Sequence, residues 1–123
     1  MSNSDIVRDF VEAFNSNDLD RIVSFFSSDA VYHNIPVDPV QGSDAIRAVI
    51  QGYTAAASKM DWVIHQLAET PEGVVLTERT DNFQFGDRQV SLRVMGAFEI
   101  ADGKISAWRD YFDMAQFQSQ MSA

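Results

Sequence analysis

Three sets of apolar residues in the first 56 positions recur at intervals of three and four, which is the spacing of amphipathic helices. We expect Ser4 to cap the first helix, whose apolar face consists of Ile6, Val7, Phe10, Val11 and Phe14. Positions 15–18 interrupt the pattern, and the second set consists of Leu19, Ile22, Val23 and Phe26. The third set follows Gly42-Ser43 and consists of Ile46, Val49, Ile50 and Tyr53. Residues 30–34, ended by Pro36 and Pro39, predict a short extended segment before the third helix.

After Ala57 the apolar rhythm changes to alternation and to continuous runs, which predict β-strands. We expect these strands over residues 60–68, 74–85, 89–100 and 104–112. Turn-forming residues separate them, namely Pro71-Glu72-Gly73, Gly86-Asp87 and Asp102-Gly103. Residues 113–121 predict a short terminal helix.

Helices followed by hairpin-linked strands indicate an α+β domain. We expect a strongly curved mixed sheet, mainly antiparallel, that forms a cone with an interior pocket together with the three N-terminal helices. No repeat or linker interrupts the chain, so residues 1–123 are expected to form a single domain. With 46% hydrophobic residues and nine phenylalanines, the chain has enough apolar side chains for a core and for a lined cavity.

The charge and the reactive residue types narrow the classes of partner and chemistry. A formal net charge of −9 argues against nucleic acid and anionic membranes as partners. The absence of cysteine excludes disulfides, thiol catalysis and Cys-based zinc sites, and His33 and His65 on separate strands do not complete a metal site. The polar segment Met1–Asp5 predicts no signal peptide, and no apolar run approaches the ~20 residues of a membrane span. We therefore expect a cytoplasmic protein without a metal site.

A charged pair occupies the middle of the strand expected at 74–85. Side chains alternate along a strand, so Arg79 and Asp81 share a face that is apolar at both ends. An arginine can hydrogen-bond to an aspartate two positions away and hold its carboxylate in place. On this strand alone, a structural ion pair is the commoner explanation.

The last expected strand places a carboxylate among aromatic side chains. Asp110 alternates in phase with Trp108 and Phe112, which normally face a core. Burial of this carboxylate needs a partner that satisfies it. Arg109 faces the other side of the strand, so Arg79 on another strand of the same sheet is the expected partner.

Tyr32 and Asn34 add two neutral polar groups on one face of the first extended segment, while His33 faces away. A phenol and an amide can hold a water molecule against a carboxylate. A satisfied buried tyrosine and a turn-forming asparagine before Pro36 explain the same residues equally well in isolation.

Together these residues supply two carboxylates with a guanidinium between them. Two like charges in one apolar pocket do not both ionise cheaply, so the pair is expected to retain one proton. An acid and a base then coexist at neutral pH, which suits the addition of water to a strained, polarisable ring.

The segments that carry these residues closely resemble limonene-1,2-epoxide hydrolases. The resemblance covers the chain from Tyr32 to Phe117, and more loosely the helices before it. The motifs that carry it are Tyr32-x-Asn34-x-Pro36, Glu78-Arg79-Thr80-Asp81, Gly96-Ala97-Phe98-Glu99-Ile100 with Asp102-Gly103-Lys104-Ile105, and Trp108-Arg109-Asp110-Tyr111-Phe112-Asp113. The resemblance implies a curved-sheet cone of the nuclear transport factor 2-like, polyketide cyclase-like superfamily, usually a homodimer, that works without metal or cofactor.

The resemblance also implies a role for each polar residue. Asp110 would take a proton from a water molecule that Tyr32 and Asn34 hold, Asp81 would protonate the epoxide oxygen, and Arg79 would bridge the two carboxylates. An apolar, cyclic or terpene-like epoxide would become a vicinal diol in one step, without a covalent intermediate. The positions implied to line the pocket are Tyr53, Phe83, Leu92, Val94, Phe112 and Phe117. Tyr53 and Phe83 are bulkier or more polar than the aliphatic residues expected there.

Two other functional classes remain open. A ketosteroid-isomerase-like or polyketide-cyclase-like enzyme on the same cone would use a carboxylate and a hydroxyl donor, but would not need an arginine between two carboxylates. A non-enzymatic binding module is the third class, since the fold does not determine the function. Outward-facing Glu78, Arg93 and Arg109 are expected to form a charged row, either solvated or at a dimer interface.

Overall fold

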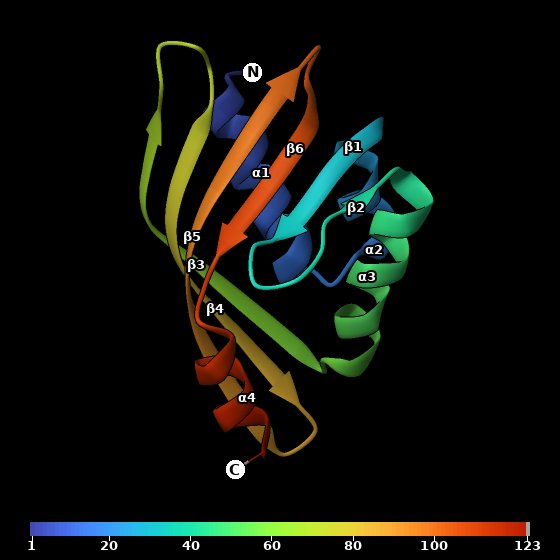
Figure 1. Ribbon diagram of the computed structural model, residues 1–123, viewed down its shortest axis with the longest axis vertical. Coiled ribbons are helices and arrows are strands. Elements are labelled where there is room, and N and C mark those ends of the chain that lie inside the picture. The colour runs from blue at the N-terminus through green and yellow to red at the C-terminus, as the bar shows by residue number, and fades with distance from the viewer. Residues whose placement is uncertain (123) are drawn as a thin grey trace.

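The computed structural model describes residues 1–122 as an α+β fold, and Ala123 of the expected domain lies outside the described residues (Figure 1). Three helices come before the third strand in the sequence, as expected, and a fourth ends the described chain. The elements are α1 (Asn3–Asn15), α2 (Leu19–Ser24), β1 (Phe26–Asn34), β2 (Val40–Gln41), α3 (Ser43–Ala56), β3 (Lys59–Glu69), β4 (Val75–Phe85), β5 (Arg88–Ala101), β6 (Lys104–Tyr111) and α4 (Met114–Ser122).

The six strands form one sheet in the order β2-β1-β6-β5-β4-β3. β1 pairs with β6 in parallel, and the other neighbours are antiparallel, so the sheet is mixed and mainly antiparallel as predicted. The sheet is strongly curved and does not close, and the helices α1 and α3 lie against its concave side (Figure 1). This curvature leaves a pocket between the sheet and α3.

The core joins the apolar face of α1 to the concave face of the sheet. Phe10 lies edge-on to Trp108 of β6, with ring centroids 5.0 Å apart. Phe14, one turn further along α1, stacks on Trp62 of β3 with centroids 4.0 Å apart. Burial of both phenylalanines holds α1 against the strands that carry the polar residues of the pocket.

Most strands and the terminal helix differ from their expected bounds by one residue, and the larger differences lie in the first 42 residues. The cap of α1 is Ser2, which forms a capping box with Asp5, and Ser4 lies inside the helix. α2 ends at Ser24, so Phe26, expected on that helix, instead begins β1 and is buried there. β1 therefore starts four residues earlier than expected, and the short β2 at Val40–Gln41 was not predicted. Helical spacing misassigned Phe26 because a buried strand end also presents an apolar residue.

α4 is attached to the part of β5 that lies beyond its pairing with β6. The Gln120 side chain accepts a hydrogen bond from the Ser91 backbone N–H at 2.7 Å and donates one to the Ser91 carbonyl at 2.8 Å. A side-chain amide thus replaces the missing neighbouring strand beside β5. This attachment places Met114 and Phe117 of α4 at the pocket.

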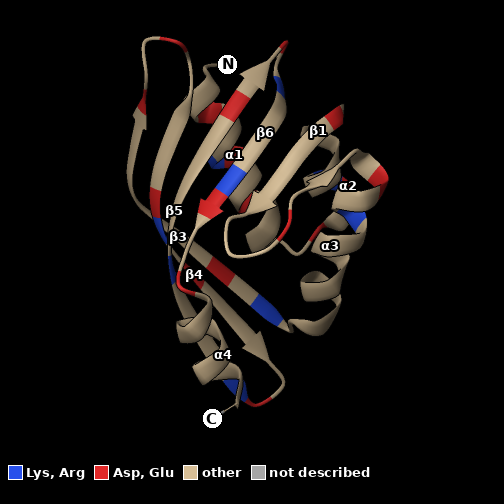
Figure 2. Cartoon of the chain, in the orientation of Figure 1, with Lys and Arg blue, Asp and Glu red and all other residues tan. Residues whose placement is uncertain are grey.

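Acidic residues occur on helices, strands and loops alike, so the negative charge is not gathered on one element (Figure 2). Within residues 1–122, no helix is both long and apolar enough to cross a membrane.

Candidate active site

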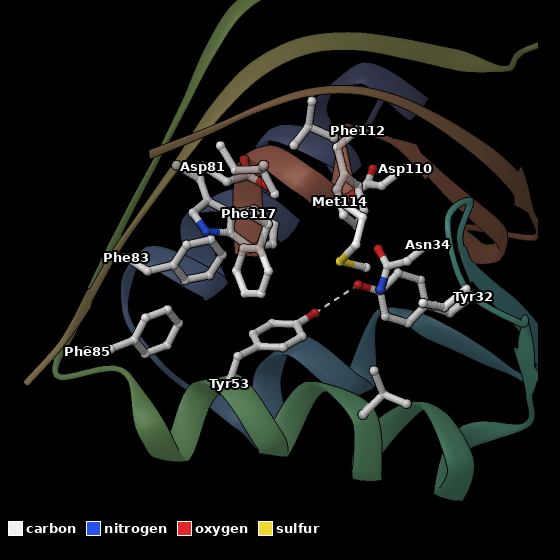
Figure 3. Close-up of a pocket in the computed structure, with 15 residues that line it drawn as sticks. Tyr32, Asn34, Tyr53, Asp81, Phe83, Phe85, Asp110, Phe112, Met114 and Phe117 are labelled. Atoms are coloured by element: carbon white, nitrogen blue, oxygen red, sulfur yellow. Dashed lines mark hydrogen bonds between the residues drawn. The ribbon is translucent and has the colours of Figure 1, made fainter. Parts of the chain in front are cut away.

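A pocket of about 210 Å³ opens between the concave face of the sheet, α3 and α4 (Figure 3). It brings together Tyr32, Asn34, Asp81 and Asp110, which come from three different strands. All six residues expected to line it do so, namely Tyr53, Phe83, Leu92, Val94, Phe112 and Phe117. Five further lining residues were not expected: Val37, Val49, Trp62, Phe85 and Met114. Most of the wall is therefore apolar, and its polar groups lie close together.

Arg79 holds the two carboxyl groups from within the protein, with 1% of its surface exposed. Its Nε and Nη2 donate to Asp81 at 3.0 and 2.9 Å. Its Nη1 and Nη2 donate to Asp110 at 3.2 and 2.8 Å, and Nη1 also donates to the Thr77 hydroxyl at 3.2 Å. All five N–H groups of the guanidinium are thus engaged, and both carboxylates are bound in the bidentate manner. The predicted arrangement of one guanidinium between two carboxylates is present.

Asp110 has an additional donor that was not expected. The Trp108 indole N–H donates to Asp110 Oδ1 at 2.7 Å, and the same oxygen accepts from Arg79. Trp108 was expected to be an apolar neighbour of this carboxylate. Its position two residues away on the same strand face was the available signal, because an indole is also a hydrogen-bond donor.

Burial, together with the negative charge of the second carboxylate, explains how one carboxyl group can retain a proton. Burial raises the pKa of Asp81 from 3.8 to about 6, although the positive charge of Arg79 acts in the opposite direction, and the negative charge of Asp110 raises it further. Burial lowers the pKa of Arg79, but the carboxylates of Asp110 and Asp81 outweigh this effect and raise it overall. Arg79 therefore stays charged, and the proton held near neutral pH belongs to the carboxyl pair.

Tyr32 and Asn34 reach the same site because β1 lies beside β6. In this parallel pairing, Asn34 is the partner of Asp110 and Tyr32 is the partner of Trp108. The Tyr32 ring stacks on Trp108 with centroids 4.2 Å apart. The Tyr32 hydroxyl lies 2.9 Å from the Tyr53 hydroxyl of α3 (Figure 3). Burial raises the pKa of both phenols, so both remain neutral.

Gly96 also has a role in the site that was not predicted from the sequence. Arg79 on β4 can bond to Asp110 on β6 only across β5, and Gly96 of β5 pairs with Thr77 on one side and Asp110 on the other. A Cβ atom at this position would lie 2.5 Å from Arg79 Nη1 and 2.7 Å from Asp110 Oδ1. A glycine inside a strand often marks such a close approach, which is the signal that could have identified it.

The two histidines lie outside the pocket. His33 is paired with the Val37 carbonyl at 3.0 Å, and His65 with the Thr80 hydroxyl at 2.8 Å. Across residues 1–122, no three histidine, cysteine or acidic side chains are grouped as a metal site would need.

This geometry can perform acid–base chemistry on a small apolar molecule. Asp110 has its carboxylate at the cavity wall next to Asn34, and Asp81 holds a second carboxyl group bound to the same guanidinium. One group can accept a proton while the other donates one, provided that they are in opposite protonation states.

Sequence comparison places this chain beside known epoxide hydrolases. Residues 1–122 match the family of the limonene-1,2-epoxide hydrolase catalytic domain. The epoxide hydrolase EphG of Mycobacterium tuberculosis is 32% identical over 108 residues, which cover 88% of this chain and 71% of that protein.

Solved structures share the fold over almost the whole chain. An M. tuberculosis LEH-like epoxide hydrolase superposes with a TM-score of 0.84 at 28% identity, covering 98% of this chain and 89% of that one. A SnoaL-like polyketide cyclase from Shewanella putrefaciens reaches the same TM-score at only 11% identity, over 98% of this chain and 85% of its own. The second likeness supports the superfamily fold alone. The family match covers all described residues, and the chain belongs to the limonene-1,2-epoxide hydrolase family.

Proposed function

We propose that this protein hydrolyses an apolar epoxide, cyclic or terpene-like, to a vicinal diol. The observation that carries the proposal is the single guanidinium of Arg79 bound by both Asp81 and Asp110 at the wall of an apolar pocket. This arrangement supplies a base and an acid whose separation is set by one rigid group. Residues 1–123 act as one catalytic domain in this proposal.

Asp110 is the proposed general base. Arg79 and Trp108 donate hydrogen bonds that orient its carboxylate, and Asn34 is its partner on the neighbouring strand. The amide of Asn34 and the hydroxyl of Tyr32 hold a water molecule against it. Asp110 takes one proton from this water as the water oxygen forms a bond to an epoxide carbon.

Asp81 is the proposed general acid. Its raised pKa, about 6, keeps part of the population protonated near neutral pH. As the carbon–oxygen bond of the epoxide breaks, its electron pair remains on oxygen, and that oxygen takes the proton of Asp81. To restore the starting state, the proton on Asp110 passes to Asp81, and Arg79 bridges the two groups because it contacts both.

The step needs neither a covalent intermediate nor a cofactor, because the water molecule is itself the nucleophile. The substrate proposed is small and apolar, which fits a cavity of about 210 Å³ walled by Phe83, Leu92 and Phe112. A cytoplasmic location for this reaction is also part of the proposal.

We also propose that the protein is a homodimer that pairs through the convex face of the sheet. Four large apolar side chains on this face are exposed, namely Val63, Leu76, Met95 and Tyr111. Met95 and Tyr111 are direct partners across β5 and β6, so they form one continuous apolar surface. Arg109, from the charged row expected on this face, is paired with Glu99. An exposed apolar patch rimmed by charges is typical of a protein interface.

The experiment that tests the reaction uses oxygen-18 water and a panel of limonene oxide, cyclohexene oxide and styrene oxide. The expected product is a vicinal diol that contains one labelled oxygen, and Asp110→Asn should abolish its formation. Absence of diol from all three epoxides would contradict the proposal. Exchange of substrate α-protons without incorporation of labelled oxygen would instead support an isomerase-like or cyclase-like reaction.

A further inference from the structure

One polar group in the pocket is used by neither the fold nor the proposed mechanism. The indole N–H of Trp62 is buried, and it is the one buried side-chain donor in residues 1–122 without a hydrogen-bond partner. Trp62 is 4% exposed and lines the cavity. A buried donor without an acceptor destabilises the empty protein, so its presence needs a reason.

The position of Trp62 is tightly determined by its backbone. β3 is the edge strand of the sheet, and on its free side Asn15 of α1 takes the place of a neighbouring strand. The Asn15 side chain accepts a hydrogen bond from the backbone N–H of Trp62 at 2.7 Å and donates one to the backbone carbonyl of Trp62 at 3.1 Å. These two bonds fix the residue that carries the unpaired indole.

The indole ring is held as well. Phe14 stacks on it with ring centroids 4.0 Å apart, and the guanidinium carbon of Arg79 lies 5.2 Å from its centroid. The Phe83 ring lies edge-on to the indole, with ring centroids 5.9 Å apart. An aromatic ring is at most a weak hydrogen-bond acceptor. The neighbours therefore orient the indole without satisfying its N–H.

Trp62 lies beside the proposed acid. It is the direct partner of Asp81 across the antiparallel β3–β4 pair, and such partners project from the same face with Cβ atoms about 5 Å apart. A ligand oxygen bound at the Asp81 carboxyl is thus within reach of the indole. The positive charge of Arg79 near the ring also favours an oxygen that carries negative charge.

We propose that the Trp62 indole N–H donates a hydrogen bond to the substrate oxygen that Asp81 protonates. This inference rests on the epoxide hydrolysis proposed above. When the carbon–oxygen bond breaks, its electron pair stays on this oxygen, and the proton of Asp81 neutralises it. Water forms the new carbon–oxygen bond and gives its proton to Asp110, while Trp62 keeps its own. The indole thus stabilises the developing charge without taking part in proton transfer.

A binding experiment tests the contact without turnover. In ¹⁵N-labelled Asp110→Asn protein, the two indole resonances are assigned with a second sample that also carries Trp62→Phe. Cyclohexene oxide should move the Trp62 indole proton downfield and slow its exchange with solvent. Cyclohexene, which has the same ring but no oxygen, should not.

Equal shifts with both compounds, or an unmoved Trp62 indole when the other pocket resonances have saturated, would overturn the inference. If neither compound binds, the inference fails together with the proposed substrate class. If wild-type protein forms no diol although the Trp62 indole binds the epoxide oxygen, the donor stands and the proposed reaction fails.

Kinetics then test the role in the reaction. Replacement of Trp62 by 3-benzothienylalanine, by site-specific incorporation, keeps the bicyclic ring and removes the N–H. We expect kcat to fall on the order of 100-fold with little change in KM, because the bond strengthens as charge develops. Trp62→Phe should show the same loss if it folds. Wild-type kcat in the benzothienyl variant would show that the indole only fills space and would overturn the inference.

Discussion

The hydroxyl oxygens of Tyr32 and Tyr53 lie 2.9 Å apart, although one residue belongs to β1 and the other to α3. A phenol has one proton, so one hydroxyl must donate to the other. If Tyr32 donates to the catalytic water as proposed, its hydroxyl must accept from Tyr53. Tyr53 is then a positioning residue for the water site as well as a part of the pocket wall.

Tyr53→Phe is expected to lower kcat by about tenfold, because it removes the donor that orients the Tyr32 hydroxyl. KM should change less, since the ring and its packing remain. Steady-state kinetics with cyclohexene oxide measure both constants. The control is a double-mutant cycle with Tyr32→Phe, in which the losses should be non-additive by about 1 kcal/mol. Additive losses would mean that the two hydroxyls act independently.

The pH dependence of kcat/KM is expected to report the proton on Asp81. Because Asp81 acts as the acid, kcat/KM should fall as the pH rises through about 6, where this carboxyl loses its proton in the free enzyme. Asp81→Asn should abolish this alkaline limb together with most of the activity. A wild-type profile that is flat from pH 5 to about 8 would argue against Asp81 as the acid.

The same pKa predicts how stability changes with pH. Folding raises the pKa of Asp81 from 3.8 to about 6, so the folded state binds this proton more tightly than the unfolded state does. The contribution of Asp81 to the free energy of unfolding is therefore full below about pH 4 and is lost as the pH rises to about 6. The loss is about 3 kcal/mol. Urea unfolding of wild type and Asp81→Asn across this range should show it as a slope that only the wild type has.

Much of the fold was predictable because local patterns determine it. The change from helical spacing to alternation after Ala57 located the strands, and alternation along β4 correctly placed Arg79 and Asp81 on the buried face. The parallel pairing of β1 with β6 was not predicted, because a hydrophobic pattern says which face is buried but not which strand is adjacent. The end of α2 at Ser24 was missed for a related reason, since Phe26 is buried in either structure.

The polar residues of the site were predictable for another reason. A carboxylate such as Asp110 between aromatic residues is costly to bury, so it required a partner, and the structure pairs it with Arg79 as expected. The roles of Trp62, Trp108 and Gly96 depend on atomic geometry. Only the structure reveals whether an indole N–H has an acceptor, or what a missing Cβ makes room for.

Gly96→Ala is expected to damage the site. The new Cβ would meet Arg79 Nη1 at 2.5 Å, Asp110 Oδ1 at 2.7 Å and the Thr77 hydroxyl at 2.9 Å, so the guanidinium or the carboxylate must move. We expect a loss of about 1–3 kcal/mol in stability and about 100-fold in kcat/KM. Chemical denaturation and steady-state kinetics measure these losses.

Gly52→Ala is the matched control, because a Cβ there meets nothing within 4 Å and the residue lies inside α3. It should leave activity unchanged and stabilise the protein by about 0.5–1 kcal/mol. An active, stable Gly96→Ala protein would mean that the bridge across β5 tolerates displacement.

Arg79→Met should be destabilising as well as inactive. It leaves Asp81 and Asp110 buried without their common cation, which costs about 3–5 kcal/mol at neutral pH. Protonation removes the uncompensated negative charge of the carboxyl groups. The loss of stability relative to the wild type should therefore shrink as the pH falls toward about 4. The exposed Arg8→Met is the control and should change stability by less than about 0.5 kcal/mol. A deficit that is independent of pH would mean that lost packing, not uncompensated charge, causes it.

Met95→Glu is expected to separate the proposed dimer. Met95 is 53% exposed on the convex face and is the direct partner of Tyr111, which is 48% exposed, so a charge there would be buried without a partner in a dimer. Sedimentation velocity should find a dimer for the wild type and a monomer for the variant. Met121→Glu, which alters an exposed methionine on α4, should remain dimeric. A wild-type protein that sediments only as a monomer would contradict the interface, and the apolar surface would then need another occupant.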